Sequence, residues 1–91
     1  MIKTFKHKGL EKFYYTGSLK GIQPHQADKL ERILDKLDAA TAIIDMNISG
    51  FKLHPLLGRK NVWSVWVNGN WRVTFLFDKG DAYIVNYEDY H

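Results

Sequence analysis

The spacing of apolar residues changes near residue 50, and this change limits the folds open to the chain more than any other feature. Before it, apolar side chains recur at helical spacing at Ala27, Leu30, Ile33, Leu34 and Leu37. After it, runs rich in β-branched and aromatic residues predict strands over 62–67, 71–77 and 82–87. Helices followed by a strand meander predict an α+β fold, with two to three helices on one face of a mainly antiparallel sheet.

Turn and capping residues mark the limits of the elements before residue 50. The segment from Met1 to Phe5 is short enough for an edge strand, and a first helix is predicted from about His7 to Tyr15, ending near Gly17. Pro24 suits the first turn of the second helix, where a backbone N–H has no partner to lose. Residues 41–47 are predicted to add a short helical turn, with Thr41 as its N-cap.

The turn between the two longest strands decides which side chains share a face. Asn68-Gly69-Asn70 is a hairpin signal, and we expect a three-residue loop with Val67 opposite Trp71, because a two-residue loop would mix polar and apolar positions. This register predicts an apolar face beneath the helices, made of Trp63, Val65, Val67, Trp71, Val73, Phe75 and Phe77. The opposite face is then expected to hold Ser64, Trp66, Arg72 and Thr74.

The third strand is expected to bring the end of the chain to this second face. Pairing Asp78 with Asp81 places Tyr87 across from Arg72. Side chains two residues apart point the same way in a strand, so Asp89 and His91 would follow on the face of Arg72.

Length and composition limit the possible classes of protein. The 91 residues are enough for one domain, 1–91, and the absence of cysteine excludes disulfides and thiolate metal sites. The sequence shows no signal peptide and no apolar run that could span a bilayer, so we expect a cytoplasmic protein without a membrane partner.

Charge is unevenly distributed along a chain whose net charge is +3. Residues 1–20 hold five lysines against Glu11, and residues 52–77 hold four basic residues and no acid, whereas 21–51 and 78–91 are net acidic. Two basic segments could form a phosphate-binding surface, or they could be ordinary solvated lysines; charge alone does not choose between these interpretations.

The common catalytic motifs are missing: there is no phosphate-binding glycine loop, paired-histidine zinc helix or dinucleotide fingerprint. Arg72 is the most informative remaining residue, because an arginine inside an apolar strand is costly unless it faces solvent, a partner or an anion. Its planar fork suits a phosphate, and Trp66 would lie beside it for a cation–π contact. The alternative is an ion pair with Glu88 or Asp89.

His54 lies in a loop that leads into the sheet. A lone loop histidine is commonly a surface residue, but Lys52, Arg59 and Lys60 would concentrate phosphate near this one. Because histidine titrates near neutral pH, it can exchange the proton that RNA cleavage moves.

The last four residues, Glu88-Asp89-Tyr90-His91, directly follow the third predicted strand. Chain ends normally fray, which is one interpretation of this segment. The other is a functional end, in which Asp89 orients a histidine or holds Arg72. A metal site of His54, Asp89 and His91 is a further alternative, but its spacing matches no common pattern, and we expect no metal or cofactor.

Four segments together resemble the HigB toxins of the RelE/ParE superfamily: Lys52-Leu-His-Pro-Leu, Asn70-Trp-Arg-Val-Thr-Phe, Gly80-Asp-Ala-Tyr-Ile and Asn86-Tyr-Glu-Asp-Tyr-His91. The resemblance spans the chain and includes its first ten residues. It implies a RelE-like fold and a metal-independent ribonuclease that cuts messenger RNA in the decoding site of the ribosome. It also implies a helix-turn-helix antitoxin, HigA, encoded beside the toxin, with operator DNA bound only through the toxin–antitoxin complex.

The resemblance carries the family's catalytic pattern onto His54, Arg72, Asp89, Tyr90 and His91. With it we expect Lys52, Arg59, Lys60 and Trp66 to contact RNA or phosphate. One departure is that relatives often carry a basic residue soon after the His-Pro-Leu, where this chain has Leu57, so either Arg59 or Lys60 would take that role.

The implied reaction is acid–base cleavage through the ribose 2′-hydroxyl, with His54 and His91 sharing the roles of base and acid and Arg72 stabilising the phosphorane. Two other functions are compatible with the sequence: a non-enzymatic inhibitor of a protein target such as gyrase, as in the ParE branch, and an RNA-binding module without catalysis.

Overall fold

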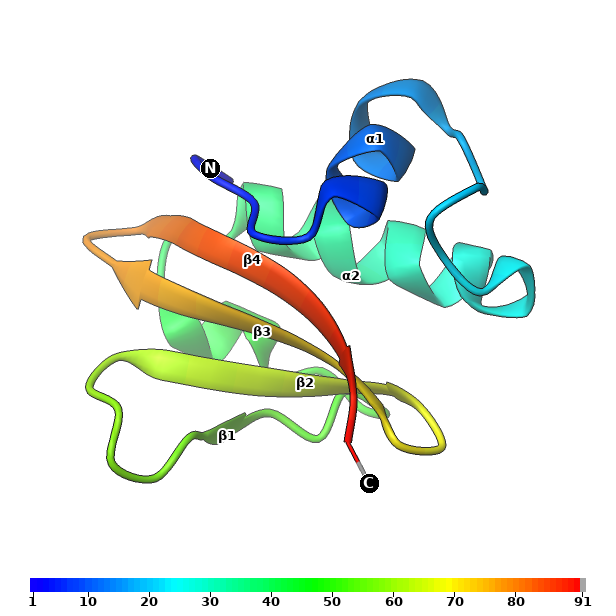
Figure 1. Ribbon diagram of the computed structural model, residues 1–91. Coiled ribbons are helices and arrows are strands. Elements are labelled where there is room, and N and C mark those ends of the chain that lie inside the picture. Colours follow the sequence, from blue (N-terminus) through cyan, green and yellow to red (C-terminus); the bar gives the residue numbers. More distant parts are fainter. Residues whose placement is uncertain (91) are drawn as a thin grey trace.

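The computed structural model describes residues 1–90, in which two α-helices pack on one face of a four-stranded antiparallel sheet (Figure 1). In chain order the elements are α1 (Lys8–Thr16), η1 (Pro24–Gln26), α2 (Ala27–Ala39), η2 (Ile43–Met46), β1 (His54–Pro55), β2 (Val62–Asn68), β3 (Trp71–Asp78) and β4 (Asp81–Asp89). The sheet order is β1-β2-β3-β4. The predicted α+β class is therefore confirmed. Within residues 1–90, neither helix is long and apolar enough to cross a membrane.

Local sequence explains both helices. The His7 side chain caps α1, since its Nδ1 accepts a hydrogen bond from the Leu10 N–H at 2.9 Å. Gly17 ends α1 in a left-handed conformation, φ 78°, that glycine adopts without strain. Pro24 opens η1, which leads directly into α2, and the predicted apolar stripe of α2 is buried against the sheet.

The segment before α1 differs from the predicted edge strand. It runs parallel to β4 but makes only two isolated bridges, from Ile2 and Phe5. Between them β4 is bulged at Ile84, and the Thr4 hydroxyl rather than a backbone carbonyl accepts the Ile84 N–H, at 2.7 Å. A regular ladder is therefore interrupted at its centre.

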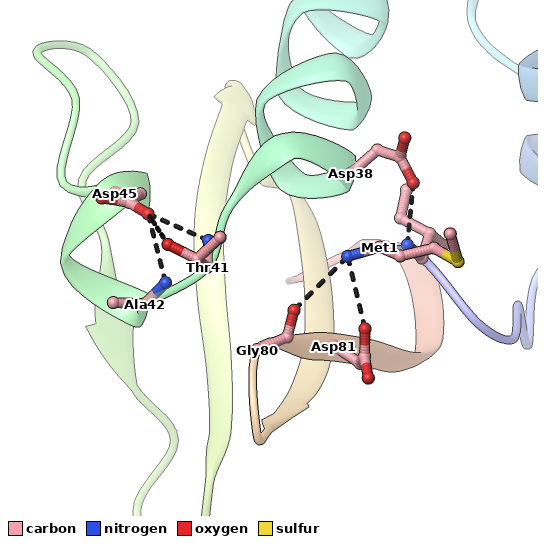
Figure 2. Close-up of polar contacts among 8 residues, drawn as sticks. Met1, Asp38, Thr41, Ala42, Asp45, Gly80 and Asp81 are labelled. Atoms are coloured by element: carbon pink, nitrogen blue, oxygen red, sulfur yellow. Dashed lines mark hydrogen bonds and ion pairs between the residues drawn. The ribbon is translucent and has the colours of Figure 1, made fainter.

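Figure 2 shows two sets of polar contacts, one at the N-terminus and one in η2. The Met1 ammonium lies 3.3 Å from the Gly80 carbonyl oxygen and 3.5 Å from the Asp81 carboxylate. In η2 the Asp45 carboxylate accepts hydrogen bonds from the N–H groups of Thr41 and Ala42, at 3.0 and 3.1 Å.

The prediction that Thr41 is the N-cap of the short helical turn was wrong, because Ala42 occupies that position. The capping acceptor comes instead from inside the turn, where Asp45 reaches back to both N–H groups. These hydrogen bonds favour the charged carboxylate and lower the pKa of Asp45.

The β2–β3 hairpin keeps the predicted register but not the predicted loop. Trp66 pairs with Arg72 as expected, yet Asn68 pairs with Trp71, so the turn has two residues rather than three. A bulge at Val67 absorbs the difference. The predicted apolar face is consequently preserved and lies in the core, against α2.

The β3–β4 hairpin corrects the predicted position of the chain end. Asp78 pairs with Asp81 as expected, but two residues of β4, at Ile84, oppose one residue of β3. Every later residue of β4 therefore shifts by one, and the face changes with it. Tyr87 lies opposite Val73 rather than Arg72, and its ring is buried in the core. Asp89 lies opposite Trp71. Tyr87 and Asp89 were therefore both predicted on the wrong face.

Candidate functional site

The sheet face away from the helices carries two adjacent rows of polar side chains. The pairing His54↔Ser64, Ser64↔Thr74 and Thr74↔Asn86 forms one row across all four strands. The second row is Trp66, Arg72 and Glu88. The rows are neighbours because their members are two residues apart along the strands. We call this surface the open face, since no helix in residues 1–90 covers it (Figure 1).

Arg72 is half-buried in the second row. Its Nη1 donates hydrogen bonds to the carbonyl oxygens of Gly69 and Trp71, both at 3.1 Å. Glu88 lies opposite it on β4, but within residues 1–90 the guanidinium forms no ion pair. The predicted alternative, an ion pair with Glu88, is therefore not realised, and most of the guanidinium donors remain available to an anion.

Trp66 lies opposite Arg72 as predicted, but its ring is occupied by other cations. The Nζ atoms of Lys29 and Lys52 each lie 4.2 Å from the ring centroid. The indole Nε1 donates a hydrogen bond to the Gly69 carbonyl oxygen at 2.9 Å. The expected cation–π contact from Arg72 is thus replaced by contacts from two lysines.

His54 lies on β1 at the edge of the open face and is exposed. Its Nδ1 lies 3.0 Å from the Lys52 carbonyl oxygen. A carbonyl only accepts, so this bond requires a proton on Nδ1 and leaves the Nε2 lone pair free in the neutral ring. Two strand spacings and two residues separate His54 from Arg72, roughly 12 Å between their Cα atoms. Two side chains of this length can approach one phosphodiester across that gap.

The end of β4 is tied to the β2–β3 turn. The Tyr90 N–H donates to the Asn70 carbonyl oxygen at 2.8 Å. Burial raises the pKa of Tyr90, and the hydrogen bond to Glu88 and its charge act in the same direction, against the positive charges of Arg59 and Arg72. Tyr90 therefore lies among charged groups of the open face and keeps its phenolic proton at neutral pH.

A pocket of about 70 Å³ lies on the open face between the rows and the β1–β2 loop, and Arg59, Thr74, Asn86 and Glu88 contribute to its lining. Of the two basic residues proposed to replace the missing charge at Leu57, Arg59 reaches this pocket. Lys60 is exposed and does not line the pocket.

The two remaining predicted site residues are Asp89 and His91. Asp89 is exposed at the end of β4, on the face opposite to Arg72. His91 lies outside the described residues. The metal alternative gains no support from this arrangement, because His54 and Asp89 lie on edge strands at opposite sides of the sheet and on opposite faces.

Sequence reasoning named Glu88 as a possible partner of Arg72, although the bulge in β4 that sets the two residues opposite each other is signalled by no residue type. It missed two other charged residues near these groups. Lys29 and Arg32 were placed on the solvent side of α2, and only the contacts with Trp66 and Phe51 show that they adjoin the sheet edge. Their helical spacing of three residues could have indicated one basic patch.

Fold and site together define a small basic α+β protein with a half-buried arginine, Arg72, on the open face of its sheet. The chain belongs to the HigB-like toxins: the family model described as the RelE-like toxin of the type II toxin–antitoxin system HigB matches residues 3–91. A relative from Proteus vulgaris, Endoribonuclease HigB, is 49% identical over 92 residues, with all of both chains covered. Membership in this family implies an antitoxin as partner.

Proposed function

We propose that this toxin is an endoribonuclease that cuts messenger RNA held in the decoding site of the ribosome. The observation that carries the proposal is the half-buried Arg72 without an ion pair among residues 1–90, on the same open face as His54 and Tyr90. An arginine fork fits a phosphate, and it shares its face of the sheet with a histidine and a tyrosine. The Proteus vulgaris relative is named as an endoribonuclease, which supports the same reaction.

The proposed reaction needs one base, one acid and one charge-stabilising group. His54 removes the proton from a ribose 2′-hydroxyl, whose oxygen then attacks the adjacent phosphorus. The bond between phosphorus and the 5′-oxygen breaks, and His91 donates the proton that the leaving oxygen requires. The products are a 2′,3′-cyclic phosphate and a 5′-hydroxyl end, and no metal or cofactor takes part in these steps.

His54 suits the role of base because its Nδ1 is bonded to the Lys52 carbonyl, which leaves Nε2 as the nitrogen able to accept a proton. Arg72 stabilises the negative charge of the phosphorane. Tyr90, a neutral phenol beside Arg72, stacks on or positions a base, and Asp89 orients His91. Lys52, Arg59, Lys60 and Trp66 contact the RNA backbone.

The ribosome supplies the part of the rate enhancement that these few catalytic groups do not provide. Acid–base catalysis contributes roughly 10²–10⁴ in rate, and a charge-stabilising donor contributes a comparable factor. Orienting the messenger on the ribosome adds the gain that comes from holding reactants in a productive geometry. The toxin then acts in the cytoplasm, is restrained by a helix-turn-helix antitoxin of the HigA kind, and meets operator DNA only in that complex.

The test uses ribosomes programmed with two messengers that differ only in a 2′-deoxy sugar at the cleavage position. We expect cleavage of the all-ribose messenger, a 2′,3′-cyclic phosphate on the upstream fragment, and no cut at the 2′-deoxy position. Free messenger should be cut far more slowly. Equal cleavage of both messengers would overturn the 2′-hydroxyl mechanism, and intact messenger with damaged DNA on expression would point to a gyrase-type target instead.

A further inference from the structure

Three basic side chains converge on the edge of the sheet around Trp66, next to the open face but outside the proposed cleavage site. Lys29 and Arg32 come from α2, and Lys52 comes from the segment before β1. The Nζ atoms of Lys29 and Lys52 lie 4.2 Å from the same ring centroid, so they are at most twice that distance apart. The Arg32 guanidinium lies 5.6 Å from the centroid of Phe51. We call these three residues the α2 basic cluster.

The three side chains of this cluster have no salt-bridge partner within the described chain. Among residues 1–90, none of them forms an ion pair, although α2 also carries acidic residues. Lys29 donates one hydrogen bond, to the Gly50 carbonyl oxygen at 3.0 Å, which leaves two of its three ammonium donors. Burial lowers the pKa of Lys29, and the charges of Arg32 and Lys52 lower it further. Like charges gathered in this way favour a bound anion.

The aromatic ring that both lysines contact favours RNA as the source of that anion. Single-stranded nucleic acids are bound by positively charged grooves combined with aromatic side chains. Trp66 is also paired directly with Arg72 across β2 and β3. A strand that presents one phosphodiester to Arg72 therefore passes Trp66 at its neighbouring nucleotides.

We propose that the α2 basic cluster is a second phosphate-binding site, which binds the RNA backbone beside the scissile phosphodiester and sets the path of the strand across Trp66. This inference rests on the proposed function for the identity of its ligand. It adds Lys29 and Arg32, which take no part in the cleavage chemistry, to the RNA-binding surface.

The test measures binding rather than cleavage. A fluorescent single-stranded oligoribonucleotide with 2′-O-methyl sugars, which has no attacking hydroxyl, is titrated with the full-length toxin at several salt concentrations. Lys29→Met and Arg32→Met keep apolar stems but remove the charge. Each is expected to weaken binding by about tenfold at low salt, the loss expected for one charge-assisted hydrogen bond. Each should also lower the slope of log K against log salt by about 0.7.

Two controls separate the cluster from general charge and from misfolding. Lys12→Met removes the same charge from α1 and should leave both affinity and slope close to those of the original protein. Lys29→Arg should restore binding, which a purely structural role of the lysine stem would not require. The loss caused by Lys29→Met should persist in an Arg72→Ala background, because the two sites are separate.

Unchanged affinity and slope in both Lys29→Met and Arg32→Met would overturn the inference and would point instead to an acidic protein as partner of the cluster. An equal loss in Lys12→Met would also overturn it, because the effect would then reflect net charge alone. Either result is independent of whether the ribosome-bound messenger is cut.

Discussion

Trp66 and Arg72 donate hydrogen bonds to the same acceptor, the carbonyl oxygen of Gly69 in the β2–β3 turn, at 2.9 and 3.1 Å. The two-residue turn and the bulge at Val67 place this carbonyl within reach of both side chains. The turn therefore fixes one edge of the guanidinium before any RNA is bound. Groups that are already oriented need no reorganisation when charge develops on a phosphate, which is the condition for efficient electrostatic stabilisation.

The shared acceptor predicts a specific effect of Trp66→Phe. This change keeps an aromatic ring for the lysines but removes the Nε1–H donor. We expect the free energy of unfolding to fall by about 1 kcal/mol, the net value of an ordinary hydrogen bond. The cleavage rate should fall more than RNA affinity, because Arg72 loses a neighbour that fixes the turn. Urea unfolding and single-turnover cleavage measure the two effects, and a rate equal to that of the original protein would contradict the positioning role.

Acid should weaken the cap of α1. Burial lowers the pKa of His7, so between pH 6.5 and the lower folded-state pKa the unfolded chain binds more protons, and stability falls as the pH falls through this window. The structural reason is that a protonated Nδ1 cannot accept the Leu10 N–H. His7→Asn should keep a cap and abolish this pH dependence, whereas His7→Ala should cost about 1 kcal/mol at pH 7.5. Urea unfolding of all three proteins at several pH values tests this, and an unchanged pH dependence in His7→Asn would contradict it.

A buried hydrogen-bond network joins β4 to the start of α2. The Tyr87 hydroxyl donates to Gln26 Oε1 and accepts from the Gln23 N–H, and the Gln26 side chain is only 3% exposed. Tyr87→Phe leaves these groups unsatisfied and should cost about 1–3 kcal/mol of unfolding free energy in urea denaturation. Tyr83→Phe removes the same atom from a half-exposed ring and serves as the control. Equal losses in the two variants would show that the network contributes nothing specific.

The bulge in β4 carries backbone strain at Ile84. This β-branched residue has φ 55°, a conformation that costs an L-residue roughly 1–2 kcal/mol. Ile84→Gly relieves the strain, whereas Ile84→Ala removes the same half-exposed side chain but keeps the Cβ. We expect the glycine variant to be more stable than the alanine variant by about 1 kcal/mol in thermal or urea unfolding. The reverse order would show that the strand does not hold this conformation.

Sequence reasoning predicted the helices, the core face and the pairing of Trp66 with Arg72, because these follow from hydrophobic periodicity and from helix caps. It failed where a single residue changes the face. The extra residue at Ile84 moved Tyr87 into the core and Glu88 to the open face. An isoleucine in the sequence does not predict a positive φ, so this bulge could not be foreseen. It also failed where tertiary contacts assign a partner, as with Lys29 and Lys52 on the Trp66 ring. Of the predicted site, it correctly placed Arg72 and Trp66 on one face, whereas His54 was expected in a loop and lies on β1.

Arg72 is the residue on which the proposed reaction most depends, and its removal gives the most direct test. The measurement is the single-turnover rate of messenger cleavage on programmed ribosomes with Arg72→Ala, next to Lys79→Ala, which removes a cation from the β3–β4 turn at the other end of the sheet. We predict a loss of about 10²–10³ in rate for Arg72→Ala, as for other charge-stabilising donors, and an unchanged rate for Lys79→Ala. Cleavage by Arg72→Ala at the rate of the original protein would contradict the assignment of the open face as the site of RNA cleavage.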